Sequence, residues 1–160
     1  METIGFHQHD HAHCIEDGMA AADECCRAAG ARLTPARRRV LEILLERHRA
    51  MGAYEILDIL RDEGLGSQPP VVYRALDFLV SQGLVHRIER LNAFAACAHP
   101  GADHTPAFLI CRNCDRVAEA TSDATKGRLG EAARASGFRI ERAVVEAVGL
   151  CPDCNKAGAA

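Results

Sequence analysis

Two pairs of cysteines carry the clearest chemical signal in this sequence. Cys111 and Cys114 form one C-x-x-C pair, Cys151 and Cys154 form another, and 36 residues separate the two pairs. Each pair brings two thiolates to one side of a tight turn, and two such turns can close a tetrahedral site of four sulfur ligands around Zn²⁺. The spacing therefore predicts a structural zinc site, with a helix and a strand between the pairs because the gap exceeds that of a compact zinc ribbon.

Other uses of these cysteines are a redox dithiol or a pair of disulfides. Neither pair stands at the start of a helix after a βαβ strand, where a thiolate would be activated. The N-terminal segment lacks the apolar core of a secretory signal, so we expect a cytoplasmic protein, and disulfides are rare there. A closed four-sulfur site leaves no open position for a substrate, and the sequence has no H-E-x-x-H, G-x-S-x-G or glycine-rich phosphate loop. We expect no enzymatic activity and no small-molecule substrate.

A second, looser group of candidate metal ligands consists of His86, Cys97, His99, His104 and Glu119. Mixed nitrogen, sulfur and oxygen donors suit a borderline metal such as zinc, whereas calcium and magnesium prefer oxygen alone. These residues come from two parts of the chain and from the segment between them, so a shared metal would fix the relative orientation of the two parts. The alternative is that an isolated cysteine and a few surface histidines near a loop bind nothing.

Histidine also alternates with other residues near the N-terminus, at His7, His9, His11 and His13, before Cys14. This segment can bind divalent metal, but its simpler interpretation is a flexible solvated tail over residues 1–15 that binds metal weakly.

Composition bounds the remaining possibilities. The chain has 160 residues, eight cysteines, eight histidines and a formal net charge of −3, and 26% of its residues are charged. No apolar run reaches the roughly 20 residues that cross a bilayer, so no membrane association is expected. Although the net charge is negative, residues 27–49 hold seven arginines against two glutamates. A local excess of positive charge is what a phosphate contact needs, and it is also common on a solvated helix face.

The elements before Cys97 are predicted as helices followed by a hairpin. Helices are expected over about 16–29, from Thr34-Pro35 onwards, over about 53–63 and over about 70–82, where Thr, Pro and Gly supply the caps. Residues 84–90 and 93–96 then flank a turn at Leu91-Asn92. The last three of these helices and the hairpin have the order of a winged helix-turn-helix, which assigns residues 16–97 to such a unit, and a helical bundle with an incidental hairpin fits the pattern equally well.

After Cys97 the chain changes character. Residues 98–106 indicate a linker. Strands are expected over 107–111 and 116–121, a helix over about 123–135 and a strand over about 138–148, so residues 107–160 form a small α+β unit. A unit of this size buries too little apolar surface to be stable without a cross-link, and the four cysteines could provide one by binding a metal ion.

Four segments resemble the ferric uptake regulator family: residues 33–44, 53–57, 69–79 and 83–92. Together with the two C-x-x-C pairs, the resemblance runs from about residue 20 to 154. The segments Ala75-Leu-Asp-Phe-Leu79 and His86-Arg-Ile-Glu89 are most similar to the zinc-uptake-regulator branch of that family. The resemblance decides between the two interpretations of the helices in favour of the winged helix.

This resemblance implies a dimeric, metal-activated transcriptional repressor, built from an N-terminal winged helix and a C-terminal α/β dimerisation domain. Two Zn²⁺ ions per protomer are implied, a structural one at Cys111, Cys114, Cys151 and Cys154 and a regulatory one at His86, Cys97, His104 and Glu119. Tyr73 and Arg74 match the recognition-helix pair that contacts DNA, with Arg37, Arg38 and Arg39 as nearby phosphate or groove contacts. The implied partners are a pseudo-palindromic operator duplex, of zinc uptake genes by resemblance, and a second copy of the chain.

Three departures from the family pattern bear on these expectations. Val71 stands where many relatives have a threonine before Val-Tyr-Arg, so a hydroxyl hydrogen bond is lost there. No histidine follows His104, which argues against a third metal site, and His99 could compete with His104 as a ligand. Open alternatives are a sensor of iron, nickel or peroxide, a zinc-stapled module that binds protein and not DNA, and a thiol oxidoreductase.

Overall fold

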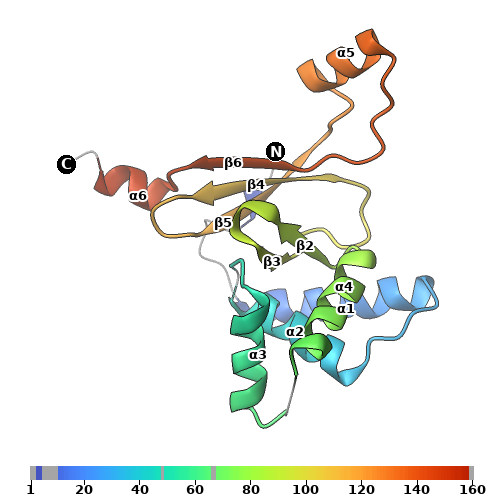
Figure 1. Ribbon diagram of the computed structural model, residues 1–160, viewed down its shortest axis with the longest axis vertical. Coiled ribbons are helices and arrows are strands. Elements are labelled where there is room, and N and C mark those ends of the chain that lie inside the picture. The colour runs from blue at the N-terminus through green and yellow to red at the C-terminus, as the bar shows by residue number, and fades with distance from the viewer. Residues whose placement is uncertain (1–2, 5–10, 48, 66–67, 159–160) are drawn as a thin grey trace. The chain divides into compact units, whose positions relative to one another are not determined.

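The computed structural model describes residues 3–4, 11–47, 49–65 and 68–158 of the 160-residue chain. The chain divides into two compact units, one of residues 7–101 and one of residues 1–6 and 102–160. The division falls inside the segment predicted as a linker, 98–106. No helix in the described ranges is long and apolar enough to span a bilayer. Figure 1 labels the helices α1 to α6 and the strands β2 to β6.

The first unit is four helices followed by a two-stranded hairpin, as predicted. Its elements are α1 (His11–Ala28), α2 (Pro35–Arg47), α3 (Ala53–Asp62), α4 (Pro69–Ser81), β2 (Val85–Ile88), the short 3-10 helix η1 (Glu89–Leu91) and β3 (Ala93–Ala96). Proline occupies the first position of α2 and of α4, where its missing N–H costs no helical hydrogen bond. Gly83 follows α4 with a φ of +69°, a conformation that glycine adopts without strain.

An aliphatic core holds this unit together. Val40, Ile43 and Leu44 of α2 are buried against Leu76 and Leu79 of α4, and all five are at most 1% exposed. Leu57 and Leu60 of α3 and Phe94 of β3 belong to the same cluster. Because the apolar side of α4 faces this core, its opposite side faces outward.

The N-terminal helix begins earlier than the sequence pattern predicts. It starts at His11, within the segment expected to be a tail, and Ile15 and Met19 pack against the core cluster. The packing of Ile15 against the core stabilises an extra helical turn before it, and local helix propensity alone does not indicate that turn. Thr3–Ile4 form the short strand β1, and residues 1–2 and 5–10, with His7 and His9, lie outside the described residues.

The second unit is a four-stranded sheet with two helices. Its elements are β1, β4 (Thr105–Cys111), β5 (Val117–Ser122), α5 (Gly127–Ser136), β6 (Val145–Gly149) and α6 (Pro152–Ala157), with strands in the order β1-β5-β4-β6. β5 is antiparallel to β4, and β6 is parallel to it, pairing Ala107 with Val145 and Cys111 with Gly149.

Two features of this unit differ from the expectation. The last strand covers Val145–Gly149 and not 138–148, because β4 offers it partners only from Ala107 to Cys111. The helix α6 was not predicted; Cys151 caps it and Pro152 opens it, so the expectation that neither C-x-x-C pair stands at the start of a helix is wrong for the second pair. The overall class, a winged helix-turn-helix with a small α/β unit, is the predicted one.

Candidate metal centres and nucleic-acid surface

The four cysteines of the C-x-x-C pairs come together in the second unit. Cys111 ends β4, Cys114 closes the turn that follows, and Cys151 and Cys154 lie at the start of α6. Their sulfur atoms all lie within 4.8 Å of one another, and the Sγ atoms of Cys114 and Cys151 are 3.7 Å apart. A tetrahedral site with Zn–S bonds of about 2.3 Å requires sulfur atoms about 3.8 Å apart, so the donor set and its spacing fit Zn²⁺.

Sheet topology explains why cysteines so distant in sequence meet. Since β6 runs parallel to β4, both strands end at the same edge of the sheet, where the N–H of Arg112 donates to the carbonyl of Gly149 at 2.9 Å. The two turns that carry the cysteines therefore leave the sheet side by side. Backbone N–H groups, that of Cys151 first, lower the pKa of the Cys111 thiol to about 6, which favours the thiolate that a metal binds.

Polar groups around the four sulfurs connect the two turns. The side-chain amide of Asn113 donates to Sγ of Cys154 at 3.3 Å, and Arg116 forms an ion pair with Asp153 at 2.8 Å. Four thiolates on Zn²⁺ carry a net charge of −2, and the amide donor of Asn113 would partly offset that charge. The Arg116–Asp153 pair is neutral overall and serves to link the two turns.

The second group of predicted ligands is divided between the two units. His104 and Glu119 belong to the second unit, where Nε2 of His104 lies 3.0 Å from Oε1 of Glu119. Glu119 is 6% exposed and is the one buried acidic or basic residue among the described residues. Nδ1 of His104 bonds the carbonyl of Ala102 at 2.9 Å, so Nδ1 carries a proton there.

This geometry accommodates either a shared proton or a cation between His104 and Glu119. With Nδ1 donating to a carbonyl, Nε2 of a neutral His104 presents a lone pair, and Oε1 of Glu119 presents another at 3.0 Å. Two lone pairs at this distance repel unless a proton or a metal ion lies between the groups. Imidazole nitrogen and carboxylate oxygen are both common zinc ligands, so this pair fits the metal predicted from the sequence.

His86 and Cys97 belong to the first unit and flank its hairpin. His86 lies on β2 opposite Ala95, and Cys97 follows β3, where its N–H donates to the carbonyl of Leu84 at 2.9 Å. Cys97 is 6% exposed. The competing ligand His99 is half-buried two residues later, and its role as a ligand stays a prediction.

The outward side of α4 carries the residues predicted to contact DNA. Tyr73 is 42% exposed and Arg74 is also exposed, whereas Val72, Ala75 and Leu76 on the opposite side are buried. No carboxylate forms an ion pair with Arg74 in the part of the chain that the structure describes. A guanidinium that no internal carboxylate holds is available to an outside acceptor.

Sequence reasoning missed one residue of this surface. Tyr54, at the beginning of α3, is 62% exposed, and its ring lies edge-on to that of Tyr73 with the centroids 6.5 Å apart. Such a pair restricts the orientation of Tyr73. A tyrosine directly after the start of a helix gave no signal by itself, because its partner lies on the following helix.

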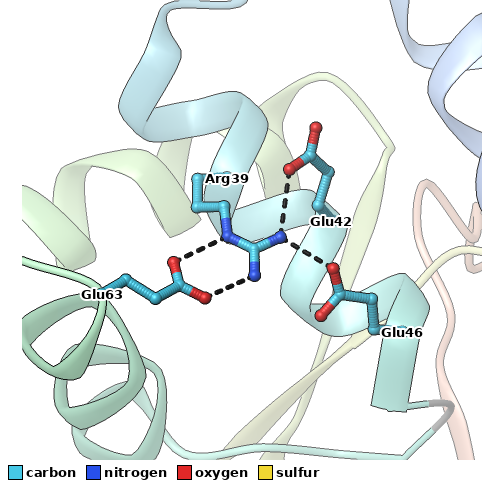
Figure 2. Close-up of polar contacts among 4 residues, drawn as sticks. All are labelled: Arg39, Glu42, Glu46 and Glu63. Atoms are coloured by element: carbon cyan, nitrogen blue, oxygen red, sulfur yellow. Dashed lines mark hydrogen bonds and ion pairs between the residues drawn. The ribbon is translucent and has the colours of Figure 1, made fainter. Parts of the chain in front are cut away.

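The predicted phosphate contacts Arg37, Arg38 and Arg39 are half-buried on α2. Each of them interacts with a side chain of another helix: Phe78 of α4, Asp23 of α1 and Glu63 at the end of α3, respectively. Figure 2 shows the contacts of Arg39.

A winged helix with an exposed tyrosine and arginine, joined in one chain to a four-cysteine metal site, defines a metal-dependent DNA-binding regulator of transcription. The model of the Ferric uptake regulator family matches residues 28–148, and the chain belongs to this family. Membership places it among regulators and not among enzymes.

The chain is similar to characterised members of the family over most of its length. It is 38% identical over 137 residues to the zinc uptake regulation protein of Escherichia coli (strain K12). The aligned residues cover 85% of this chain and 80% of the relative. A solved structure of a zinc uptake regulator complexed with zinc and DNA matches with a TM-score of 0.83 and 36% identity, covering 91% of this chain and 98% of that one. The structure of holo XcZur matches with a TM-score of 0.77 and 39% identity, over 88% and 98% of the two chains.

Proposed function

We propose that this protein is a zinc-responsive transcriptional repressor whose zinc-loaded dimer binds a pseudo-palindromic operator, with zinc uptake genes as the expected targets. The observation that carries the proposal is the likeness, over 91% of the chain, to a regulator bound to both zinc and DNA. The exposed face of α4 and the two groups of zinc ligands support it. As a regulator of transcription the protein would work in the cytoplasm.

The four cysteines would hold a structural zinc ion. All four positions of a tetrahedral site would be taken by Cys111, Cys114, Cys151 and Cys154, which leaves none for a substrate or a solvent molecule. These residues join the end of β4 to α6 and so clamp the parallel strand β6 in its register. The expected role is stability of the second unit, not sensing.

The regulatory zinc ion would be held by His86 and Cys97 of the first unit and by His104 and Glu119 of the second. When bound, zinc would supply coordinate bonds that join the two pairs. Each pair is already ordered within its own unit, by the hairpin in one case and by the carbonyl of Ala102 in the other. Joining them would restrict the orientation of one unit against the other and so raise the fraction of protein that can bind DNA. Two zinc ions per protomer follow from the two ligand sets.

The donor set of the regulatory site favours zinc over iron, the metal of one alternative hypothesis. Cys97 offers a thiolate, and soft sulfur donors suit zinc better than the harder ferrous ion, which prefers nitrogen and oxygen ligands. The similarity is also lower to the peroxide operon regulator of Bacillus subtilis, at 26% identity over 145 residues. A sensor of iron or of peroxide is therefore less well supported.

Recognition of DNA would use the outward side of α4. Tyr73 and Arg74 would reach base edges in the major groove, where arginine pairs with guanine through two hydrogen bonds. Contact between phosphates and Arg37, Arg38 or Arg39 stays a prediction. A dimer would place two copies of α4 in successive major grooves, which requires an operator with two related half-sites.

The second unit offers a surface for the partner protomer. β6 is an edge strand whose residues are mostly exposed, and Val145 and Val148 are 39% and 44% exposed. Gly130 is the one buried residue of α5, Leu129 beside it is 55% exposed, and Figure 1 shows α5 away from the sheet. A strand at the edge of the described sheet and exposed apolar side chains indicate burial in an assembly, and we propose that a second copy covers them.

The test combines zinc content with DNA binding. A duplex enriched from a random-sequence pool by the zinc-loaded protein serves as the probe, and its affinity is measured against free zinc at fixed salt for the native protein, Cys97→Ser and the control Cys14→Ser. The expected result is two zinc ions per protomer in the native protein and in the control. The Cys97 variant should keep one zinc ion and its dimeric state and lose DNA affinity.

Two results would overturn parts of the proposal. If Cys97→Ser binds the duplex with the native zinc dependence, Cys97 is not a regulatory ligand, and the site has to be rebuilt around His99 and His104. If the native protein enriches no duplex at any zinc concentration, the DNA-binding function itself is wrong.

A further inference from the structure

The three consecutive arginines of α2 cannot share one face of the helix. Successive residues of an α-helix are rotated by about 100°, so Arg37 and Arg39 point about 200° apart. A strip of phosphate contacts would instead use residues three or four positions apart. The contacts that the three side chains make agree with this geometry, because each one reaches a different helix.

Arg39 joins α2 to the end of α3. Its Nε and Nη2 donate to the two carboxylate oxygens of Glu63, at 2.8 and 2.5 Å, and its Nη1 donates to Glu46 at 2.7 Å and to Glu42 at 3.1 Å (Figure 2). These bonds use four of the five N–H groups of the guanidinium. The side chain is 24% exposed. Arg39 therefore has little capacity left for a phosphate.

Glu63 stands at a position that matters for the recognition helix. It is the C-cap of α3, and the two residues after it close the helix end, with Gly64 N–H donating to Arg61 and Leu65 N–H donating to Leu60, both at 2.9 Å. The chain then leads to α4, which begins at Pro69. A bidentate arginine–carboxylate pair is directional, so it fixes where this turn starts relative to α2.

Arg37 and Arg38 make corresponding links to two other helices. The guanidinium of Arg37 lies 3.6 Å from the centre of the Phe78 ring on α4, and its Nη1 donates to the carbonyl of Arg32 at 2.7 Å. Arg38 forms an ion pair with Asp23 of α1. A stacked guanidinium loses its contact if the ring moves, so Arg37 holds α4 directly.

The positive charge counted along the chain is largely neutralised in the folded unit. Within residues 27–49 the arginines exceed the glutamates by five. Carboxylates from outside this range pair with four of these arginines: Asp23, Glu24, Glu55 and Glu63. They reduce the excess to one, which is weak support for a phosphate-binding strip.

We propose that Arg37, Arg38 and Arg39 act as an internal hub that orients the recognition helix, with Arg39 as the main positioning residue, and that they are not phosphate contacts. This inference rests on the proposed function, since it assigns the hub to DNA recognition by α4. The two roles predict opposite signs for the removal of the Glu63 charge. If Arg39 bound phosphate, loss of its internal competitor would strengthen DNA binding; if Arg39 positions the turn through Glu63, the same change weakens it.

The experiment is a double-mutant cycle with Arg39→Gln, Glu63→Gln and the double variant. Affinity for the enriched duplex is measured with zinc-loaded protein at several salt concentrations. Glu24→Gln is the control, because it removes a carboxylate from an exposed pair on α1 that does not touch the hub. Each single variant is expected to lose about fivefold in affinity per half-site, and the double variant should lose no more than either single one. The salt dependence should stay native in all of them.

Two results would overturn the hub. One is a Glu63→Gln variant that binds DNA as well as or better than the native protein. The other is an Arg39→Gln variant whose slope of log affinity against log salt falls by about 0.9 per protomer, the value for one lost phosphate contact.

A readout without DNA separates this inference from the proposed function. Hydrogen exchange of the Gly64 and Leu65 amides reports the turn directly. Exchange should be faster in Arg39→Gln and in Glu63→Gln and native in Glu24→Gln. If the native protein binds no DNA but exchange follows this pattern, the hub stands and the proposed function fails. If exchange is native in all variants, the hub is wrong whatever the protein binds.

Discussion

Replacement of Arg74 by alanine is the most direct test of how α4 meets DNA. Arg74 lies on the outward side of α4, and none of the ion pairs described above involves it. Its truncation should therefore change the free energy of unfolding by less than about 0.5 kcal/mol, as for most surface substitutions. Zinc content should also stay native. Any loss of DNA binding can then be assigned to the lost contact.

The expected loss follows from the geometry of a dimer on a two-fold operator. A bidentate arginine–guanine contact is worth about 1–3 kcal/mol of discrimination. Two protomers lose it together, so binding should weaken by about 2–6 kcal/mol, or at least about 30-fold. Because the contact reads a base, affinity for a duplex of scrambled sequence should fall much less.

Fluorescence anisotropy at saturating zinc, with the enriched and the scrambled duplex at two salt concentrations, measures both effects. Arg74→Lys keeps the charge but not the two parallel donors, so it should behave like the alanine variant on the enriched duplex. Arg142→Ala removes an exposed arginine of the second unit and serves as the control. The reasoning is refuted if Arg74→Lys binds like the native protein, or if Arg74→Ala weakens both duplexes equally and lowers the salt slope.

Three further predictions concern the second unit. Cys111→Ser should lose the structural zinc ion and lower the melting temperature of this unit, as measured by metal analysis and calorimetry, whereas Cys14→Ser should change neither. Hydrogen bonds from the Thr125 hydroxyl, the Thr125 backbone N–H and the Lys126 ammonium lower the pKa of Asp123 from its ordinary value of 3.8 to about 2. The stabilisation that the Asp123 carboxylate provides should therefore be complete above pH 3.8, be lost as the pH falls through about 2, and be absent in Asp123→Asn. An NMR titration of this carboxylate that gives an ordinary pKa would contradict the prediction. Gly130→Ala would place a Cβ 2.0 Å from the carbonyl oxygen of Thr125, so it should cost more than about 1 kcal/mol in urea unfolding, whereas Gly149→Ala, with no atom within 4 Å of the new Cβ, should cost less.

Elements with local signals were predictable from the sequence. The proline-opened helices α2 and α4 and the glycine after α4 were placed within a residue or so, because caps act on their own turn. The start of α1, the strand β1 and the parallel pairing of β4 with β6 were not predicted. Each depends on a partner far away in the sequence, such as Val117–Ser122 for β1, and no local pattern reports it.

The candidate sites divide in the same way. The spacing of the C-x-x-C pairs alone predicts a zinc site, and the structure brings all four sulfur atoms together. Single residues such as His86 and Glu119 have no fixed spacing, so their residue types made them candidate ligands and only the resemblance to the family assigned them to a regulatory site. The arginines of α2 show what a sum of charge along the chain leaves out: carboxylates that pair with them, Glu63 among them, come from other helices.

The pairing of β4 with β6 also orders events during folding. In the first unit many of the packed elements are neighbours along the chain, such as α1 with α2, α3 with α4 and β2 with β3, and such local topologies form quickly. In the second, Ala107 must find Val145 across the whole of β5 and α5 before the parallel strands can align, which is a slow, entropically costly loop closure. A newly made or partly unfolded chain would then present α4 before its zinc-binding unit is complete. The DNA-reading part would be available first, and control by metal would be acquired last.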